Sequence, residues 1–326
     1  MLPRRYALSA LLGHGLMTLV PGGALAQIIS PMSPIADTPP KPQVRHGRLE
    51  RLQGLPWRHV PERPVEVWLP PDYDALKAAG TRFAVLYLHD GQMLWDASTT
   101  WNRQAWSVDQ SLTRLMRAGA IVPTLVVGIW NRVEHRHSEY FPQKHLEFLD
   151  TSTRDTLLRE ALRGSAQADA YLRFLVEELK PLIDQRYATR PDPAHTAIMG
   201  SSMGGMISVY ALCEYPQVFG RVAGLSTHWV GAHRPNAQLP MAAFRYLQAH
   251  LPVPRGHRLY QDHGTTELDA LYPPYQRIVD QIARDRGWRE GGPDASYMSR
   301  IFEGTGHNEN AWAERLEVPL KFLLGR

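Results

Sequence analysis

Residues 196–206 read Thr-Ala-Ile-Met-Gly-Ser-Ser-Met-Gly-Gly-Met, and the rest of the chain is best interpreted outward from them. A short apolar run enters a Gly-x-Ser-x-Gly element, and a helix-compatible run leaves it. This pattern is typical of a nucleophile elbow, a sharp strand-to-helix turn that lifts a serine, here Ser202, above the sheet edge. We expect glycine at 200 and 204 because side chains there would collide where the strand and helix backbones pass closely.

Apolar runs on both sides of this element predict further strands, at 63–70, 83–88, 124–129, 221–226, 258–262 and 297–302. Apolar residues at helical spacing predict helices at 106–118, 168–185, 241–251, 271–286 and 309–324. Strand and helix therefore alternate, which predicts an α/β fold with a mostly parallel central sheet and helices on both faces. In such sheets the chemistry lies beyond the carboxyl ends of the strands.

The composition limits the classes of function. The chain has 326 residues, of which 44% are hydrophobic, enough for one large globular domain. Its net charge is only +4 and no long basic block occurs, so nothing points to nucleic acid as a partner. Cys213 is the sole cysteine, which excludes an intrachain disulfide, and its helical position among apolar residues favours a buried thiol.

The amino-terminal residues 1–26 have the pattern of a secretory signal peptide. Arg4 and Arg5 precede a mostly apolar stretch, and residues 24–26 form an Ala-x-Ala cleavage site. We therefore expect export to the periplasm or the medium, with no membrane span in the mature chain. Residues 27–43, rich in proline and without periodicity, are expected to form an extended arm or linker.

The remaining residues, 44–326, are expected to form a single domain with one long insertion at about 131–164. The insertion is polar, and loops of this length usually carry function, so we interpret it as a lid or pocket wall. The alternative is a solvated surface excursion. His135 and His137 lie here, but no further residue completes a zinc-like spacing, and we predict no metal site.

A serine nucleophile needs a base and a group that orients the base, in the chain order serine, acid, histidine. Of the fourteen histidines, His307 alone follows the last predicted strand and precedes the last helix, which is where the base is required. The acid should follow the 258–262 strand, where Asp269 is preferred and Glu267 remains open. Asp262, still at the strand end, is expected to cap the loop.

The reaction also needs amide donors for the oxyanion. One is expected from the backbone N–H of Met203, directly after the nucleophile, and the other from Gln92 in the loop after the 83–88 strand. Trp101 and Trp229 each follow an apolar strand and are predicted to contact substrate, because aromatic walls suit sugar rings and aryl groups. Ordinary core filling is the alternative for both tryptophans.

Several ordered segments together resemble the esterase D and enterochelin-esterase-like branch of the α/β-hydrolases. They are Val-Glu-Val-Trp-Leu-Pro-Pro-Asp-Tyr (65–73), Val-Leu-Tyr-Leu-His-Asp-Gly-Gln (85–92), Met-Gly-Ser-Ser-Met-Gly-Gly (199–205) and Gly-His-Asn-Glu (306–309) with Trp312. The resemblance implies an α/β-hydrolase fold and a serine carboxylesterase that needs no cofactor. It carries Ser202 and His307 over as nucleophile and base, and Asp269 is similar to the family's acid.

The expected function is that of an exported serine carboxylesterase that works through an acyl-enzyme. Relatives in the resembling branch act on feruloyl and acetyl esters of polysaccharides and on siderophores, so the expected substrate is a carbohydrate-linked acyl ester or a siderophore-type ester. Two alternatives remain: acyl transfer to a sugar acceptor by the same residues, and non-catalytic binding of a carbohydrate or siderophore. The sequence predicts no oligomeric state.

Overall fold

A single eight-stranded sheet runs through the part of the chain that the computed structural model describes, residues 40–231 and 236–326. The spatial order is β1-β2-β4-β3-β5-β6-β7-β8. From β4 to β8 neighbouring strands are parallel, whereas β2 is antiparallel to both of its neighbours. The strands are Arg48–Leu52, Val65–Leu69, Ala84–Leu88, Thr124–Ile129, Thr196–Ser201, Arg221–Leu225, Arg258–Gly264 and Tyr297–Phe302, from β1 to β8.

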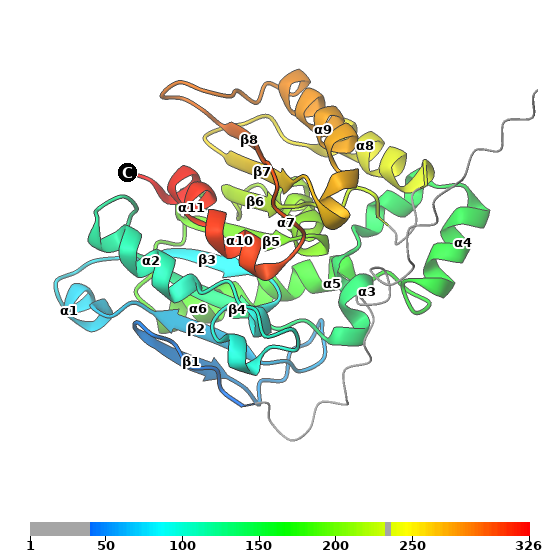
Figure 1. Cartoon of the computed structure of the whole chain (residues 1–326). Helices are drawn as coiled ribbons and strands as arrows, with labels where there is room; N and C mark the ends of the chain where they lie inside the picture. Colours follow the sequence, from blue (N-terminus) through cyan, green and yellow to red (C-terminus); the bar gives the residue numbers. More distant parts are fainter. Residues whose placement is uncertain (1–39, 232–235) are drawn as a thin grey trace, which may run out of the picture. The chain divides into compact units, whose positions relative to one another are not determined.

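Helices cover both faces of this sheet (Figure 1). One face packs against α2 (Val108–Arg117), α10 (Glu309–Arg315) and α11 (Glu317–Leu324). The other face carries α5 (Ala168–Arg173), α6 (Lys180–Arg186), α7 (Met203–Glu214), α8 (Gln238–His250) and α9 (Pro273–Asp285). Successive β3 residues alternate between these two cores, as the pleat of a strand requires. The predicted α/β architecture is therefore confirmed.

Buried parallel strands account for the clearest sequence signals. Strand β3 with the preceding Phe83, and the whole of β4, are inaccessible to solvent. Continuous apolar runs in the sequence predicted both strands. The edge strand β1 was not expected, because its sequence Arg-Leu-Glu-Arg-Leu is mostly charged. Only Leu49 and Leu52 of β1 are buried, and Arg51 pairs instead with Glu66 of β2. An edge strand of this kind gives little hydrophobic pattern.

Two of the expected helices are interrupted. The run at 168–185 contains a π-helical segment, Phe174–Leu179, between α5 and α6. The run at 309–324 divides at Leu316 into α10 and α11. Short helices also occur in the loops: α1 (Tyr73–Ala78), the 3₁₀ turns η2 (Gly91–Met93) and η3 (Ala97–Thr99), and η7 (Pro193–His195) and η8 (Glu267–Leu271).

The insertion at about 131–164 is folded onto the domain. It contains η4 (Val133–His135), α3 (Arg136–Tyr140), η5 (Gln143–Phe148) and α4 (Thr151–Glu160). α3 packs on α5 and α7, and η5 packs on α8. Glu139 forms a buried two-point ion pair with Arg63, at 2.7 and 2.8 Å. The first part of the insertion is thus held against the domain by buried polar pairing, whereas α4 is largely exposed with only Leu157 buried.

The predicted signal peptide, residues 1–26, lies outside the described residues, as does most of the predicted arm. Of the arm, only 40–43 are described, and they have no regular secondary structure. Residues 40–326 form one compact unit. Within 40–231 and 236–326 no helix is long and apolar enough to cross a membrane.

Candidate active site

Ser202 occupies the tight turn between β5 and α7. β5 ends at Ser201 and α7 begins at Met203, so a single residue makes the connection. Its backbone has φ 57° and ψ −122°, a conformation that costs a non-glycine residue about 1–3 kcal/mol. The turn is held from the neighbouring strand, because the Ser202 amide donates to the Leu225 carbonyl at 2.9 Å. The side chain remains partly exposed at the carboxyl end of the sheet.

The two glycines of the motif have different reasons to be there. A Cβ on Gly200 would lie 2.8 Å from the backbone of Gly204, so the expected collision of strand and helix occurs at this position. A Cβ on Gly204 would reach only ordinary contact, 3.4 Å from atoms of His89 and Asp90. The expectation of a collision at Gly204 is therefore wrong, but its small size lets the start of α7 approach the turn after β3.

Asp269 and His307 are joined directly. The imidazole Nδ1 lies 2.6 Å from the Asp269 carboxylate, and because a carboxylate accepts, Nδ1 carries the proton. The second carboxylate oxygen accepts from the Ser226 hydroxyl and from the Gly264 amide, both at 2.6 Å. Burial opposes ionisation of Asp269, but these donors outweigh it and hold the pKa of the carboxyl below its usual range.

Glu267, the open alternative for the acid, contacts the backbone of the histidine loop. Its Oε2 accepts from the His307 amide at 2.8 Å, and a Cβ on Gly306 would lie 2.5 Å from the same oxygen. In an extended loop the two acids, two residues apart, would share one side. Instead η8 is a 3₁₀ helix, in which residues two apart diverge, so only Asp269 turns inward.

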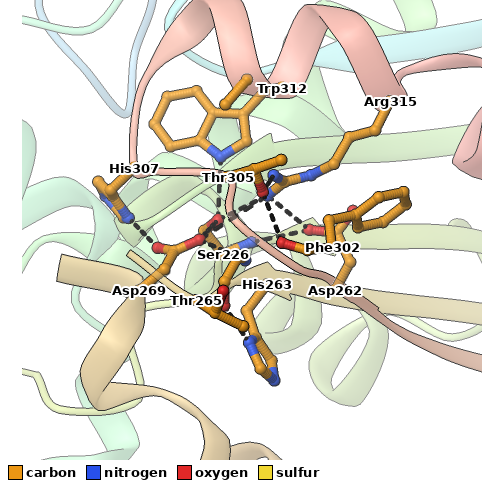
Figure 2. A network of polar contacts seen from close by, with 12 residues as sticks. Ser226, Asp262, His263, Thr265, Asp269, Phe302, Thr305, His307, Trp312 and Arg315 are labelled. Carbon is orange, nitrogen blue, oxygen red and sulfur yellow. Dashed lines mark hydrogen bonds and ion pairs between the residues drawn. The ribbon is translucent and has the colours of Figure 1, made fainter. Parts of the chain in front are cut away.

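A buried polar network holds the acid from behind (Figure 2). The Ser226 hydroxyl, at the end of β6, accepts from the Trp312 indole at 3.0 Å and from Arg315 at 2.8 Å, while it donates to Asp269. Arg315 of α10 also donates to Asp262 at 3.0 Å. Helix α10 is thereby tied to the acid loop through side chains that are almost inaccessible to solvent.

Asp262 was expected to cap the loop, but in the structure it does not. It is inaccessible to solvent and accepts from Arg315, from the Tyr260 hydroxyl at 2.8 Å and from the Ser226 amide at 3.2 Å. Burial raises the pKa of Asp262 above its usual value in spite of these donors. The side chain points into the domain because alternation along β7 turns it toward α10, and the loop begins only after Gly264.

Tyr272 is a neighbour of both Ser202 and His307. Its ring meets the His307 imidazole edge to face, with centroids 5.7 Å apart. Burial raises the pKa of Tyr272 well above its usual value, and a hydrogen bond with the Ser202 side chain opposes that rise. The Tyr272 hydroxyl also lies 2.8 Å from Nδ1 of His228. Ser202 and His307 thus share one tyrosine as a neighbour, although they are far apart in sequence.

The turn after β3 brings the predicted oxyanion segment to the same place. Gly91 is required here, because a Cβ would lie 2.8 Å from the backbone of Gly128. Asp90, with φ 57°, receives two hydrogen bonds from Arg136 at 2.7 and 2.8 Å and one from Asn131 at 2.6 Å. Burial alone would raise the pKa of Asp90, but the Arg136 guanidinium brings it below the usual range. The insertion is therefore anchored to this turn through α3.

Gln92 lies within η2, and its side-chain oxygen accepts a hydrogen bond from the backbone N–H of Asn131 at 3.2 Å. Met203, as the first residue of α7, has an amide with no acceptor within its own helix. His89, beside them, is buried against Tyr171 at 2.8 Å, and burial lowers its pKa to about 3, so it is neutral.

The two tryptophans predicted to contact substrate differ in exposure. Trp101 is 55% exposed, in the loop after η3. Trp229 is 1% exposed, and its indole N–H donates to Gln276 at 2.9 Å, so its ring packs in the core as the alternative described. No group of three or more His, Cys, Asp or Glu side chains that could hold a metal ion occurs in the described ranges.

Comparison with known proteins is decisive for the family. The Esterase family model, described as "Putative esterase", matches residues 61–323, most of the chain. The chain belongs to this esterase family. Membership supports an esterase, an enzyme that hydrolyses carboxylic esters, and agrees with the resemblance of the ordered motifs.

Individual relatives of this esterase are distant. Protein YbbA of Bacillus subtilis, described as uncharacterized, is 26% identical over 164 residues, 50% of this chain and 56% of YbbA. An endo-1,4-beta-xylanase/feruloyl esterase of Xylanibacter ruminicola is 25% identical over 206 residues, 63% of this chain and 24% of that protein. The chain thus spans little more than half of the first relative and a quarter of the second.

A solved structure confirms the fold. The enterobactin esterase FES from Shigella flexneri, determined in the presence of enterobactin, is 21% identical with a TM-score of 0.58. The alignment covers 90% of this chain and 62% of that chain. Together with the strand order and the antiparallel β2, this likeness establishes the α/β-hydrolase fold for this esterase.

Sequence reasoning did not find several residues that shape the site of this esterase. Ser226 and Arg315 lie 89 positions apart, and neither belongs to a motif. Asp90 falls within the 85–92 segment and Arg136 within the polar insertion, but neither residue received a predicted role from the sequence. A signal was present for Tyr272, which follows Asp269 closely in the segment similar to the family's acid.

Proposed function

We propose that this protein is a serine carboxylesterase in which Ser202 attacks the ester carbonyl, His307 takes the serine proton, and Asp269 orients the imidazole. The observation that carries the proposal is the 2.6 Å contact of Asp269 with His307 Nδ1. It places the proton on Nδ1, so the Nε2 lone pair is available as a base. His307 then donates that proton to the leaving alcohol, and water releases the acyl group by the reverse sequence.

The amides of Met203 and Gln92 are the proposed donors to the oxyanion. The approach of Gly204 to His89 and Asp90 supports this, because it brings the start of α7 to the turn that holds Gln92. Each such donor is worth about 3–4 kcal/mol in enzymes where it has been removed. The ionised Asp90 would oppose a nearby oxyanion, and its pairing with Arg136 neutralises that charge.

The proposal is tested by replacing one serine of the motif at a time. Ser202→Ala should reduce kcat for p-nitrophenyl acetate by at least about a thousandfold, since loss of a serine nucleophile costs up to about 10⁶-fold. Wild-type protein should be labelled by a fluorophosphonate, and Ser202→Ala should not. Ser201→Ala is the matched control and should keep both properties. An active Ser202→Ala variant, or an unlabelled and inactive wild type, would overturn the proposal.

For the substrate, we propose an ester with an aromatic or carbohydrate-linked acyl group. One relative is named as a xylanase/feruloyl esterase, and feruloyl esters are esters of an aromatic acid; a similar solved structure is named as an enterobactin esterase, which keeps a siderophore-type ester in the panel below. The exposed ring of Trp101 supports the same choice, because it offers a stacking face. Turnover of a panel of feruloyl, acetyl-xylan and catecholate-siderophore esters decides which class of ester is the substrate. Trp101→Ala should raise KM for the best substrate of the panel with kcat little changed.

We also propose that the protein is exported, on the strength of the charged, apolar and Ala-x-Ala segments within residues 1–26. Expression of the full gene with a carboxyl-terminal tag, followed by amino-terminal sequencing of the product outside the cytoplasm, tests this. A mature chain that starts near Gln27 is expected, and an uncleaved product retained in the cytoplasm would contradict export.

A further inference from the structure

A basic cavity opens at the amino-terminal ends of β6 and β7, at the end of the sheet opposite to Ser202. Its volume is about 580 Å³, within the range of about 300–1,000 Å³ that is usual for small-ligand sites. The loops that follow α8 and α9 form its sides, at 253–258 and 286–296. Nothing in the proposed esterase mechanism uses this cavity.

The lining is strongly cationic. Four arginines contribute to it, Arg221, Arg258, Arg286 and Arg289, against a single acidic residue, Asp294. Arg221 and Arg258 are register partners at the starts of adjacent parallel strands, so the fold itself places two guanidinium groups side by side.

In the part of the chain that the structure describes, these arginines form no ion pairs. Within residues 40–231 and 236–326, no carboxylate lies within 4 Å of any of the four guanidinium groups. Arg221 instead donates to the Gly256 carbonyl at 2.6 Å, Arg258 to the Phe322 carbonyl at 2.9 Å, and Arg286 to the Leu251 carbonyl at 2.8 Å. Carbonyl groups fix the orientation of the side chains but leave their charge uncompensated, and the other guanidinium N–H groups stay available.

The arrangement is electrostatically costly in the absence of an anion. Burial, followed by repulsion from Arg258, lowers the pKa of Arg221 to about 10. Asp192 acts in the opposite direction, but its carboxylate is engaged 2.7 Å from His195. Arg258 also lines an adjoining cavity of about 290 Å³ whose other charged lining residues are Arg300, Lys321 and Arg326 with Glu290, and Lys321 is paired with Glu317.

We propose that this cavity binds a polyvalent oxyanion, a ligand with two or more phosphate or carboxylate groups. Planar guanidinium groups form paired hydrogen bonds with both kinds of group. A single small anion would meet only part of the cationic lining, whereas two linked anionic groups can reach Arg221 and Arg258 as well as Arg289 at the rim. The site is remote from Ser202, so binding there is independent of the esterase proposal.

Titration calorimetry on the full-length protein tests this, with pyrophosphate, citrate and acetate as probes at constant ionic strength. We expect saturable binding of pyrophosphate or citrate at one site per chain and none of acetate. The stronger of the two identifies phosphate or carboxylate groups as the natural chemistry. The proposal would be overturned if neither pyrophosphate nor citrate bound saturably at concentrations up to about 10 mM. A Kd of that size corresponds to a binding free energy of only a few kcal/mol.

Two charge-matched variants locate the site. The Arg289 side chain is exposed and has no hydrogen bond or ion pair among the described residues, so Arg289→Gln should fold normally. Arg117→Gln removes another exposed charge that forms no ion pair among the described residues; Arg117 lies at the end of α2 and does not line the cavity. Arg289→Gln should raise Kd at least about tenfold, the effect of one charge-assisted hydrogen bond. Arg117→Gln should leave Kd within twofold, and equal effects, or none from Arg289→Gln, would refute the site.

Discussion

The two ends of strands β6 and β7 differ in how their charges are treated. At the carboxyl end, Asp262 and Asp269 are inaccessible to solvent, and Arg315, His307 and Ser226 satisfy them. At the amino end of the same strands, Arg221 and Arg258 stand in register, and among the described residues they are hydrogen-bonded to carbonyl groups and form no ion pair with a carboxylate.

This difference shows what each end can do. A fully compensated buried network fixes side-chain positions, which a base needs if it is to meet a nucleophile within hydrogen-bond reach. An uncompensated cluster costs free energy and can recover it only from an added counter-charge. The first end is therefore suited to catalysis on a neutral ester, and the second to binding an anion.

The largest effect should follow from replacing Asp269, at the carboxyl end of the sheet, where the buried charges are compensated. Asp269→Asn keeps the shape of the side chain but no longer fixes the His307 proton on Nδ1, so kcat/KM for p-nitrophenyl acetate should fall by about 10⁴-fold. Glu267→Gln is the matched control, because Glu267 contacts only the backbone and neighbouring side chain of the histidine loop. It should cost less than about tenfold. Comparable losses in the two variants would mean that Asp269 is not the orienting acid.

The next largest effect should be a loss of stability on replacing Arg315, which hydrogen-bonds both Ser226 and Asp262. Arg315→Met leaves Asp262 buried without its cation, and should lower the free energy of unfolding by about 3–5 kcal/mol. Arg114→Met removes an ion pair with Glu317 on the surface and should cost at most about 1 kcal/mol. Urea denaturation of both variants measures the difference, and a mild effect at Arg315 would show that the network adds little stability.

Much of this compensated end could be predicted from the sequence, because its principal residues carry local patterns. The elbow motif selects Ser202 as the proposed nucleophile, and position after the last strand selects His307 as the proposed base. The choice of Asp269 over Glu267 depends on the path of η8, since an extended loop and a 3₁₀ helix direct residues two apart differently. No local pattern reports that path.

The supporting network and the cationic cavity were beyond sequence reasoning for a related reason. Ser226, Arg315 and Asp262 come from three separate elements, and only the sheet order brings them together. The pairing of Arg221 with Arg258 depends on the register of β6 and β7. Continuous apolar runs locate buried strands in the chain, but they do not give the register between strands.

The two aspartates should respond to acid in opposite ways. The pKa of Asp269 is lowered in the folded state, so its contribution to stability is complete above the usual carboxyl value, about 3.9, and is lost as the pH falls through the folded value. The pKa of Asp262 is raised, so protonation of Asp262 favours the fold below that usual value and this benefit is lost as the pH rises. Thermal unfolding of Asp269→Asn and Asp262→Asn between pH 3 and 7 should show differences from wild type that change with opposite slopes. Equal slopes would contradict the assignment of the two environments.

The smallest expected effect concerns the uncompensated end without any ligand. Salt screens repulsion between partly buried charges only weakly, so an increase from about 0.05 to 0.5 M sodium chloride should stabilise the wild type by at most a few tenths of a kcal/mol through the Arg221–Arg258 pair. Arg221→Gln removes the repulsion and should lose that increment, whereas Arg117→Gln should keep it. Because chloride is monovalent, the increment reports screening and not occupation of the cavity by a polyvalent anion. An identical salt dependence in all three proteins would mean that the two strand-end arginines do not repel each other appreciably, and the contrast between the ends of the sheet would then rest on the missing carboxylates alone.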